Sequence, residues 1–197
     1  MGIRKKALIL NYGAGNTASL KYALERLDAE VIISDQAKAV EGSDVLFIPG
    51  VGAAKQAMDQ IKQKELSSVI LNYKKPVLGI CLGMQLLCRH SEEGDVGTLD
   101  VFPDQVNLFK EDINVPHLGW NKITFEDHQL FNEIPQESHF YFVHSYKVGK
   151  SDYSLAYCEY GAKFTAVLQK DNFFGCQFHP EKSDKYGQQF LANFLKL

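Results

Sequence analysis

The sequence contains no long apolar run and little excess of charge of either sign. No stretch approaches the roughly 18 apolar residues that a membrane-spanning helix requires, so we expect no association with a membrane. The formal net charge is -3, which gives no electrostatic reason to expect a nucleic acid as a partner. Basic residues occur between Met1 and Lys6, but the apolar stretch at 7–10 is too short for a signal peptide.

Cysteine is scarce, and neither cysteine nor histidine occurs in a metal-binding pattern. The four cysteines show no CxxC spacing and are too few for a disulfide framework, which favours a reducing, cytoplasmic setting. No HExxH occurs among the six histidines. His139 and His144 are an odd number of residues apart on an expected strand, so they point to opposite faces. We expect no metal and no cofactor.

Nothing in the sequence divides the chain. Internal repeats, low-complexity tracts and linkers are all missing, and 197 residues is an ordinary length for one domain with a sizeable core. We predict a single domain that spans residues 1–197.

The first half alternates apolar strands with helices. Short apolar runs at 7–10, 31–33, 45–48 and 77–80 predict buried strands. Helices are expected at 17–27, with Thr17 as the N-cap and Leu20, Leu24 and Leu27 on one face, and at 53–73. This order predicts a parallel sheet covered on both faces. Ligands gather at the carboxyl ends of such strands, where the loops 11–16 and 49–52 and the turn at Cys81 are expected to meet.

The second half predicts shorter strands in a mixed or antiparallel arrangement. Asp171-Asn172 is typical of a turn that joins two strands of a hairpin. A closing helix is expected at 183–197, with Tyr186, Phe190, Phe194 and Leu197 on one side. The expected strands lie at 106–109, 121–125, 140–148, 154–159, 164–169 and 173–178.

A cysteine stands at the junction of the fourth strand with the helix that follows. Gly79 and Gly83 lie two residues on either side of Cys81, the pattern of a nucleophile elbow. A sharp turn of this kind needs backbone free of side chains on both sides. It also brings the sulfur near a helix N-terminus, which favours a thiolate.

A cysteine nucleophile needs a base, and the base needs a group to orient it. His179-Pro180-Glu181 follows an expected strand, and an extended conformation turns His179 and Glu181 toward the same side. In isolation this pattern is typical of a surface turn. In a chain with a cysteine elbow, it predicts a general base with its orienting carboxylate.

An oxyanion hole completes such a site. The backbone N–H of Leu82, directly after the cysteine, is one expected donor. The second is expected from the 49–52 loop, at Val51 or Gly52, because its glycines allow a peptide to turn its N–H inward.

Several stretches resemble known families. Gly79-Ile-Cys81-Leu-Gly83-Met-Gln85 and His179-Pro-Glu181 resemble the class I, or triad, glutamine amidotransferases. Further stretches are similar to the glutaminase subunits of imidazole glycerol phosphate synthase, in family order across nearly the whole chain: Asn11-Tyr-Gly-Ala-Gly-Asn16, Pro49-Gly-Val-Gly52, Pro116-His-Leu-Gly-Trp-Asn121, Tyr141-Phe-Val-His-Ser-Tyr146 and Gln177-Phe-His-Pro-Glu-Lys-Ser183.

The resemblance implies a fold and a reaction. The fold is a flavodoxin-like, three-layer α/β fold with a mostly parallel mixed central sheet. Cys81 attacks the carboxamide of glutamine, His179 acts as base and then as acid, and Glu181 orients His179. Ammonia leaves, and water hydrolyses the glutamyl thioester. The positions that match the glutamine pocket are Gly50, Gly52, Gln85, Ser145 and Tyr146.

The resemblance also implies a partner. In the family, the ammonia passes to a (β/α)8-barrel cyclase subunit, which makes imidazole glycerol phosphate and an aminoimidazole carboxamide ribotide in histidine biosynthesis. Asn16, Trp120 and Tyr141 fall in stretches that face this partner in the resulting heterodimer. The sequence departs from the family at Leu118, where methionine is usual, and matches it poorly at 92–110.

Two other functions are weighed against this one. A triad glutaminase of another synthase, or a related γ-glutamyl cysteine hydrolase, has the same triad and stays an alternative, although the partner-facing stretches argue against it. A binding module without catalysis is disfavoured because Cys81, His179 and Glu181 are all present.

Overall fold

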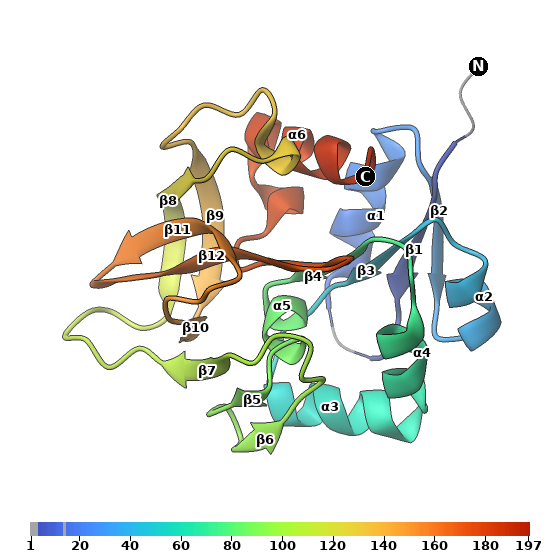
Figure 1. The fold of residues 1–197 in the computed structure, drawn as a ribbon, viewed down its shortest axis with the longest axis horizontal. Helices are drawn as coiled ribbons and strands as arrows, with labels where there is room; N and C mark the ends of the chain where they lie inside the picture. Colours follow the sequence, from blue (N-terminus) through green and yellow to red (C-terminus); the bar gives the residue numbers. More distant parts are fainter. Residues whose placement is uncertain (1–3, 14) are drawn as a thin grey trace.

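The computed structural model describes residues 4–13 and 15–197, and a nine-stranded sheet runs through it (Figure 1). Residues 1–3 and Ala14 lie outside the described residues, so the basic start of the chain and the expected 11–16 loop are described only in part. The strands follow the order β2-β1-β3-β4-β13-β12-β11-β8-β9.

The first half of the chain forms the parallel part of this sheet, as predicted. Strand β1 pairs with β2 and β3, and β4 pairs with β3 and β13, all in parallel. The bounds are β1 (Lys6–Leu10), β2 (Glu30–Ser34), β3 (Val45–Ile48), β4 (Val77–Ile80) and β13 (Phe173–Cys176).

Helices cover both faces of the parallel strands. Along β1, Ala7 and Ile9 join one buried apolar cluster, whereas Leu8 and Leu10 join another. This alternation has the period of two that a strand imposes on its side chains, so both faces must be covered. Figure 1 shows α1 and α6 on one side and α3, α4 and α5 on the other. The bounds are α1 (Thr17–Glu25), α2 (Ala37–Glu41), α3 (Ala54–Gln63), α4 (Leu66–Asn72), α5 (Leu82–Leu86) and α6 (Asp184–Phe194).

Two details of the predicted helices are wrong. The single helix expected at 53–73 is two helices, because Glu65 has a left-handed φ of 55° and ends the first one. Thr17 is the first helical residue of α1, and its N-cap is Asn16, whose Oδ1 accepts a hydrogen bond from the Ser19 N–H at 3.2 Å.

The second half extends the sheet with antiparallel strands. Strands β12 and β13 form the hairpin predicted at Asp171-Asn172, and β11, β8 and β9 follow in antiparallel order. The strand expected at 140–148 is interrupted at Ser145, and its second part, β10, pairs with β7 in a separate four-stranded sheet. The bounds are β5 (His90–Ser91), β6 (Val96–Gly97), β7 (Gln105–Leu108), β8 (His117–Phe125), β9 (His139–His144), β10 (Tyr146–Val148), β11 (Ser154–Tyr160) and β12 (Ala162–Lys170), with short 3-10 helices η1 (Gln129–Phe131) and η2 (Pro180–Lys182).

Within the described part of the chain, none of the helices has the length and apolar character needed to cross a membrane.

Candidate active site

Cys81 lies at a strained turn between β4 and α5. Its φ of 53° and ψ of -107° are unusual for a residue with a side chain. The flanking glycines are required because the backbone packs so closely here. A Cβ at Gly79 would lie 2.5 Å from the Gly83 carbonyl oxygen, and one at Gly83 would lie 1.8 Å from the Ile48 carbonyl oxygen. The turn therefore has the elbow geometry that the glycine spacing predicts.

His179 and Glu181 form a buried pair. Nδ1 of His179 lies 2.8 Å from Oε1 of Glu181, and their side chains are only 2% and 4% exposed. Because a carboxylate accepts hydrogen bonds, Nδ1 carries the proton and donates it, which leaves Nε2 of the neutral ring as the basic nitrogen. That Nε2 has no hydrogen-bond partner among the described residues.

The charges around His179 favour its protonated form. Burial works to lower the pKa of His179, but Cys81 and Glu181 outweigh it and hold this pKa well above its usual range. The backbone is fixed as well, because the His179 N–H donates to the Tyr141 carbonyl oxygen at 2.9 Å. The imidazole is thus held by Glu181 at Nδ1, and its backbone is held by the Tyr141 carbonyl.

A cavity of about 290 Å³ opens beside Cys81. Of the residues that the sequence assigns to the oxyanion hole and the glutamine pocket, most line this cavity: Val51, Gly52, Leu82, Gln85, Ser145 and Tyr146. Gly50 is buried behind it, where a Cβ would lie 2.6 Å from the Leu82 Cβ. The loop after β3 and the start of α5 therefore meet at the sulfur, as expected for the carboxyl ends of neighbouring parallel strands.

Four further residues line the cavity that the sequence analysis did not assign to it. They are Glu93, Pro116, Val143 and His144. Glu93 brings a carboxylate to the cavity, and its Oε2 accepts a hydrogen bond from the N–H of Ala54, the first residue of α3, at 2.8 Å. Glu93 lies in the 92–110 stretch that matches the family poorly, so no motif indicated it.

Two contacts of the Cys81 sulfur come from other parts of the chain. Sγ lies 3.6 Å from the Val143 carbonyl oxygen, to which a thiol can donate. It also lies 3.6 Å from Nε2 of Gln177. From the sequence, Gln177 is known only as the first residue of the 177–183 motif.

Two of the residues expected to face a partner lie side by side. Trp120 and Tyr141 pair across β8 and β9, with ring centroids 6.1 Å apart, and Trp120 is 52% exposed. Leu118, two residues earlier on β8, is also exposed and pairs with Val143 of the cavity wall. Asn16 is seen in the structure as the N-cap of α1.

Among residues 4–13 and 15–197, no group of three or more histidine, cysteine or acidic side chains could hold a metal ion. All four cysteines are free and buried, and burial raises the pKa of Cys158 to about 12 and that of Cys176 well above its usual range.

Comparisons with known proteins agree with this geometry. A family described as glutamine amidotransferase class-I matches residues 8–197. The imidazole glycerol phosphate synthase subunit HisH of Bacteroides thetaiotaomicron is 45% identical over 195 residues, which cover 98% of this chain and 100% of that protein. The subunit HisH 2 of Campylobacter jejuni strain RM1221 is 47% identical over 193 residues, or 97% of this chain and 98% of that protein. The fold is similar to that of PurLQS from Thermotoga maritima, with a TM-score of 0.75, 16% identity and coverage of 98% and 99% of the two chains.

Proposed function

This chain belongs to the class-I glutamine amidotransferase family, and on that premise we propose that it hydrolyses glutamine at Cys81 as a subunit of imidazole glycerol phosphate synthase. The observation that carries the proposal is the buried His179–Glu181 pair beside a cysteine at a strained elbow, with a cavity in front of the sulfur. The similarity over nearly the whole chain to subunits named HisH supports the choice of synthase.

The triad acts in two stages. Nε2 of His179 takes the Cys81 thiol proton as the sulfur attacks the side-chain carbonyl carbon of glutamine. The C–N bond then breaks, and His179 gives that proton to the leaving nitrogen, so that ammonia departs and a glutamyl thioester remains. His179 next takes a proton from water, whose oxygen attacks the thioester, and glutamate leaves as the thiol re-forms. Glu181 holds Nδ1–H and stabilises the imidazolium in both stages.

The oxyanion is held by backbone donors. The Leu82 N–H, at the first position of α5, is one donor, and an N–H from Val51 or Gly52 is the other. Gly52 has a φ of 101°, which only glycine adopts without strain, and a Cβ there would meet nothing within 4 Å. The backbone at Gly52 is therefore in a conformation that favours glycine, which suits a loop that presents an N–H to the cavity.

The glutamine substrate is an α-amino acid with an ammonium and a carboxylate. Glu93 is the acidic side chain in the cavity wall, and it binds the α-ammonium group. Ser145 and Tyr146 also line the cavity, at the break between β9 and β10. We place the carboxamide of glutamine between Cys81 and the oxyanion donors.

The ammonia requires an acceptor subunit. The exposed face of β8 and β9 is apolar at Leu118, Trp120 and Tyr141 and continues into the cavity wall at Val143. Exposed aromatic and aliphatic groups of this kind are typical of protein interfaces. This face, together with Asn16, is proposed to bind a (β/α)8-barrel cyclase subunit.

The chain is also proposed to form one amidotransferase domain over residues 1–197 and to work in the cytoplasm. The unbroken nine-stranded sheet supports the first point, and the four free cysteines support the second.

Ammonia release tests the function. We expect little release from glutamine by this chain alone, and strong activation when a barrel cyclase subunit and its phosphoribosyl ligand are added. Fast hydrolysis that ignores the cyclase would instead identify a glutaminase of another system or a γ-glutamyl hydrolase. No hydrolysis under either condition would leave a binding module without catalysis.

A further inference from the structure

Gln177 is a fully buried residue whose side chain contacts the candidate nucleophile. It follows β13, where its backbone N–H donates to the Ala166 carbonyl oxygen at 2.9 Å. Its side-chain Nε2 lies 3.6 Å from Cys81 Sγ, within reach of the large sulfur atom. Whether this contact stabilises or repels a thiolate depends on which end of the amide faces the sulfur.

The orientation of that amide is determined by a backbone carbonyl. The Tyr146 oxygen can only accept hydrogen bonds, and it lies 3.0 Å from Nε2 of Gln85. Gln85 must therefore present its NH₂ group to Tyr146. The second N–H of that group reaches Oε1 of Gln177 at 3.1 Å. Gln177 is thereby held with its oxygen toward Gln85 and its NH₂ group toward Cys81.

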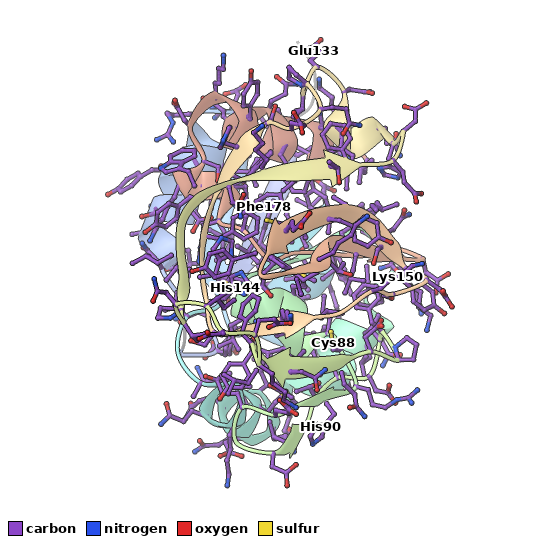
Figure 2. The ribbon with its side chains drawn as sticks, turned by 90° about the vertical axis from the view of Figure 1, so that its left-hand side faces the viewer. Cys88, His90, Glu133, His144, Lys150 and Phe178 are labelled. Atoms are coloured by element: carbon purple, nitrogen blue, oxygen red, sulfur yellow. The ribbon has the colours of Figure 1, made fainter. Side chains whose placement is uncertain are left out.

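The Tyr146 carbonyl, where this series of hydrogen bonds begins, is itself held in place. Nδ1 of His144 lies 2.8 Å from the same Tyr146 oxygen, so the carbonyl accepts from both His144 and Gln85. His144 is buried, and it is labelled near the middle of the view in Figure 2. The side-chain amides of Gln85 and Gln177 thus each have a hydrogen-bond partner that allows only one orientation.

The Val143 carbonyl favours a hydrogen-bond donor on the other side of the sulfur. It can accept from the Cys81 thiol at 3.6 Å, but once His179 has taken the proton, an oxygen with lone pairs faces a negative sulfur. A donor N–H on the sulfur offsets that repulsion.

We propose that Gln177 is a further catalytic residue, which stabilises the Cys81 thiolate by an N–H···S hydrogen bond, and that Gln85 is the positioning residue that orients it. This inference rests on the proposed function, in which Cys81 is the nucleophile. Because both N–H groups of Gln85 donate to protein oxygens, only Gln85 Oε1 is left to contact the substrate.

Alkylation of Cys81 by iodoacetamide tests the proposal without glutamine or a partner. The thiolate displaces iodide and forms a thioether, and peptide mass spectrometry separates Cys81 from the other cysteines. We expect the rate at pH 7.5 to fall about 10- to 100-fold in Gln177→Leu, because a hydrogen bond to a charged group is lost. The rate profile of Gln177→Leu should move to higher pH, because this variant leaves His179, Tyr12 and Cys176, which interact electrostatically with Cys81, unchanged.

Two further variants keep the test decisive if Gln177→Leu does not fold. Gln177→Glu preserves the shape but replaces the amide donor with a carboxylate, whose negative charge at pH 7.5 repels the thiolate, so its rate should fall at least as far. Gln85→Leu leaves the Gln177 amide free to rotate, so a smaller fall is expected. Asn193→Leu is the control, because it removes another buried amide, which donates to the Leu130 and Asn132 carbonyl oxygens away from Cys81.

The outcomes separate this inference from the function on which it rests. Slower alkylation in the Gln177 variants, with a wild-type profile in Asn193→Leu, supports it. Folded Gln177 variants that react like the wild type would overturn it while leaving Cys81 as the nucleophile. If wild-type Cys81 reacts no faster than the buried Cys158, the nucleophile itself is wrong, and this proposal is wrong with it. In glutamine hydrolysis, Gln177→Leu should lower kcat with little change in KM, since Gln177 contacts the sulfur.

Discussion

Nδ1 of His117 lies 3.1 Å from Nε2 of His144, and the two residues face each other across β8 and β9. His144 donates from Nδ1 to the Tyr146 carbonyl, so its Nε2 accepts and His117 donates. Nε2 of His117 then accepts from Asn121, whose Nδ2 lies at 3.3 Å. Every nitrogen of this pair is satisfied only while both rings are neutral.

We predict that this pair makes stability depend on pH below neutrality. Burial lowers the pKa of His117 to about 4 and that of His144 to about 3. In the unfolded chain these histidines have a pKa of about 6.5. Between that pH and the folded pKa values, the unfolded chain binds the protons and the folded chain does not. The contribution of the pair to the free energy of unfolding is therefore fully present above about pH 6.5 and decreases as the pH falls toward the folded values. Each histidine contributes a slope of up to about 1.4 kcal/mol per pH unit.

Urea denaturation between pH 6 and pH 5 measures that slope. His144→Gln should flatten it by about one proton. His139→Gln is the matched control, since His139 lies on the same strand with its side chain exposed on the other face, and it should leave the slope unchanged. Equal slopes in wild type and His144→Gln would show that the pair is not neutral in the folded protein.

A second prediction concerns the elbow. Gly83→Ala places a Cβ 1.8 Å from the Ile48 carbonyl oxygen, and this clash is with backbone, which cannot move aside as a flexible side chain can. We expect a loss of about 3 kcal/mol or more in the free energy of unfolding. Gly149→Ala, where a Cβ meets nothing within 4 Å, should stay within about 1 kcal/mol of wild type. Similar thermal midpoints for the two variants would contradict the close packing.

A third prediction ranks the triad. Cys81→Ala should abolish glutamine hydrolysis, and His179→Ala should lower kcat by about 10²- to 10⁴-fold. Glu181→Ala should cost roughly one to two orders of magnitude less than His179→Ala, because Glu181 orients the base and transfers no proton. The exposed Glu126→Ala serves as the control. Equal losses for His179→Ala and Glu181→Ala would mean that the two residues act as one unit.

A fourth prediction separates substrate binding from chemistry. Glu93→Gln should raise KM for glutamine by about 10-fold or more, because one charge-assisted contact to the α-ammonium is lost. Its kcat should change less, since Glu93 contacts no reacting atom. Glu92→Gln is the neighbouring control, whose carboxylate instead accepts from the Leu108 N–H at 2.7 Å. An unchanged KM in Glu93→Gln would remove Glu93 from the substrate site.

A fifth prediction concerns the apolar face of β8 and β9. Trp120→Ala should weaken binding of the cyclase subunit by about 30-fold, as expected for an aromatic anchor worth about 2 kcal/mol. Basal hydrolysis by the chain alone should stay the same. Leu71→Ala, an exposed apolar position on α4, is the control. Calorimetric titration that finds equal affinities for both variants would place the interface elsewhere.

The sequence by itself determined the elements and the reactive groups. The apolar runs at 7–10, 45–48 and 77–80 became strands β1, β3 and β4, which are buried on both faces between helices. The run at 31–33 was also predicted to be buried, but it became β2, an edge strand with only one neighbour in the sheet, which stays partly exposed. The glycines around Cys81 and the short His179-Pro-Glu181 motif act over a few residues, so the local sequence alone predicts their geometry. The break at Glu65 was missed because a left-handed residue leaves little mark in a helical pattern.

Only the tertiary structure decided which distant groups meet. Gln85 and Gln177 are 92 residues apart, and they contact each other because β4 and β13 are neighbours in the sheet. Glu93 reaches the cavity from the β5–β6 hairpin of the smaller sheet, and His144 is buried while His139 on the same strand is exposed. Periodicity specifies which face a side chain takes along its own strand. The neighbour it meets depends on strand order, which non-local pairing and the packing of the whole core decide.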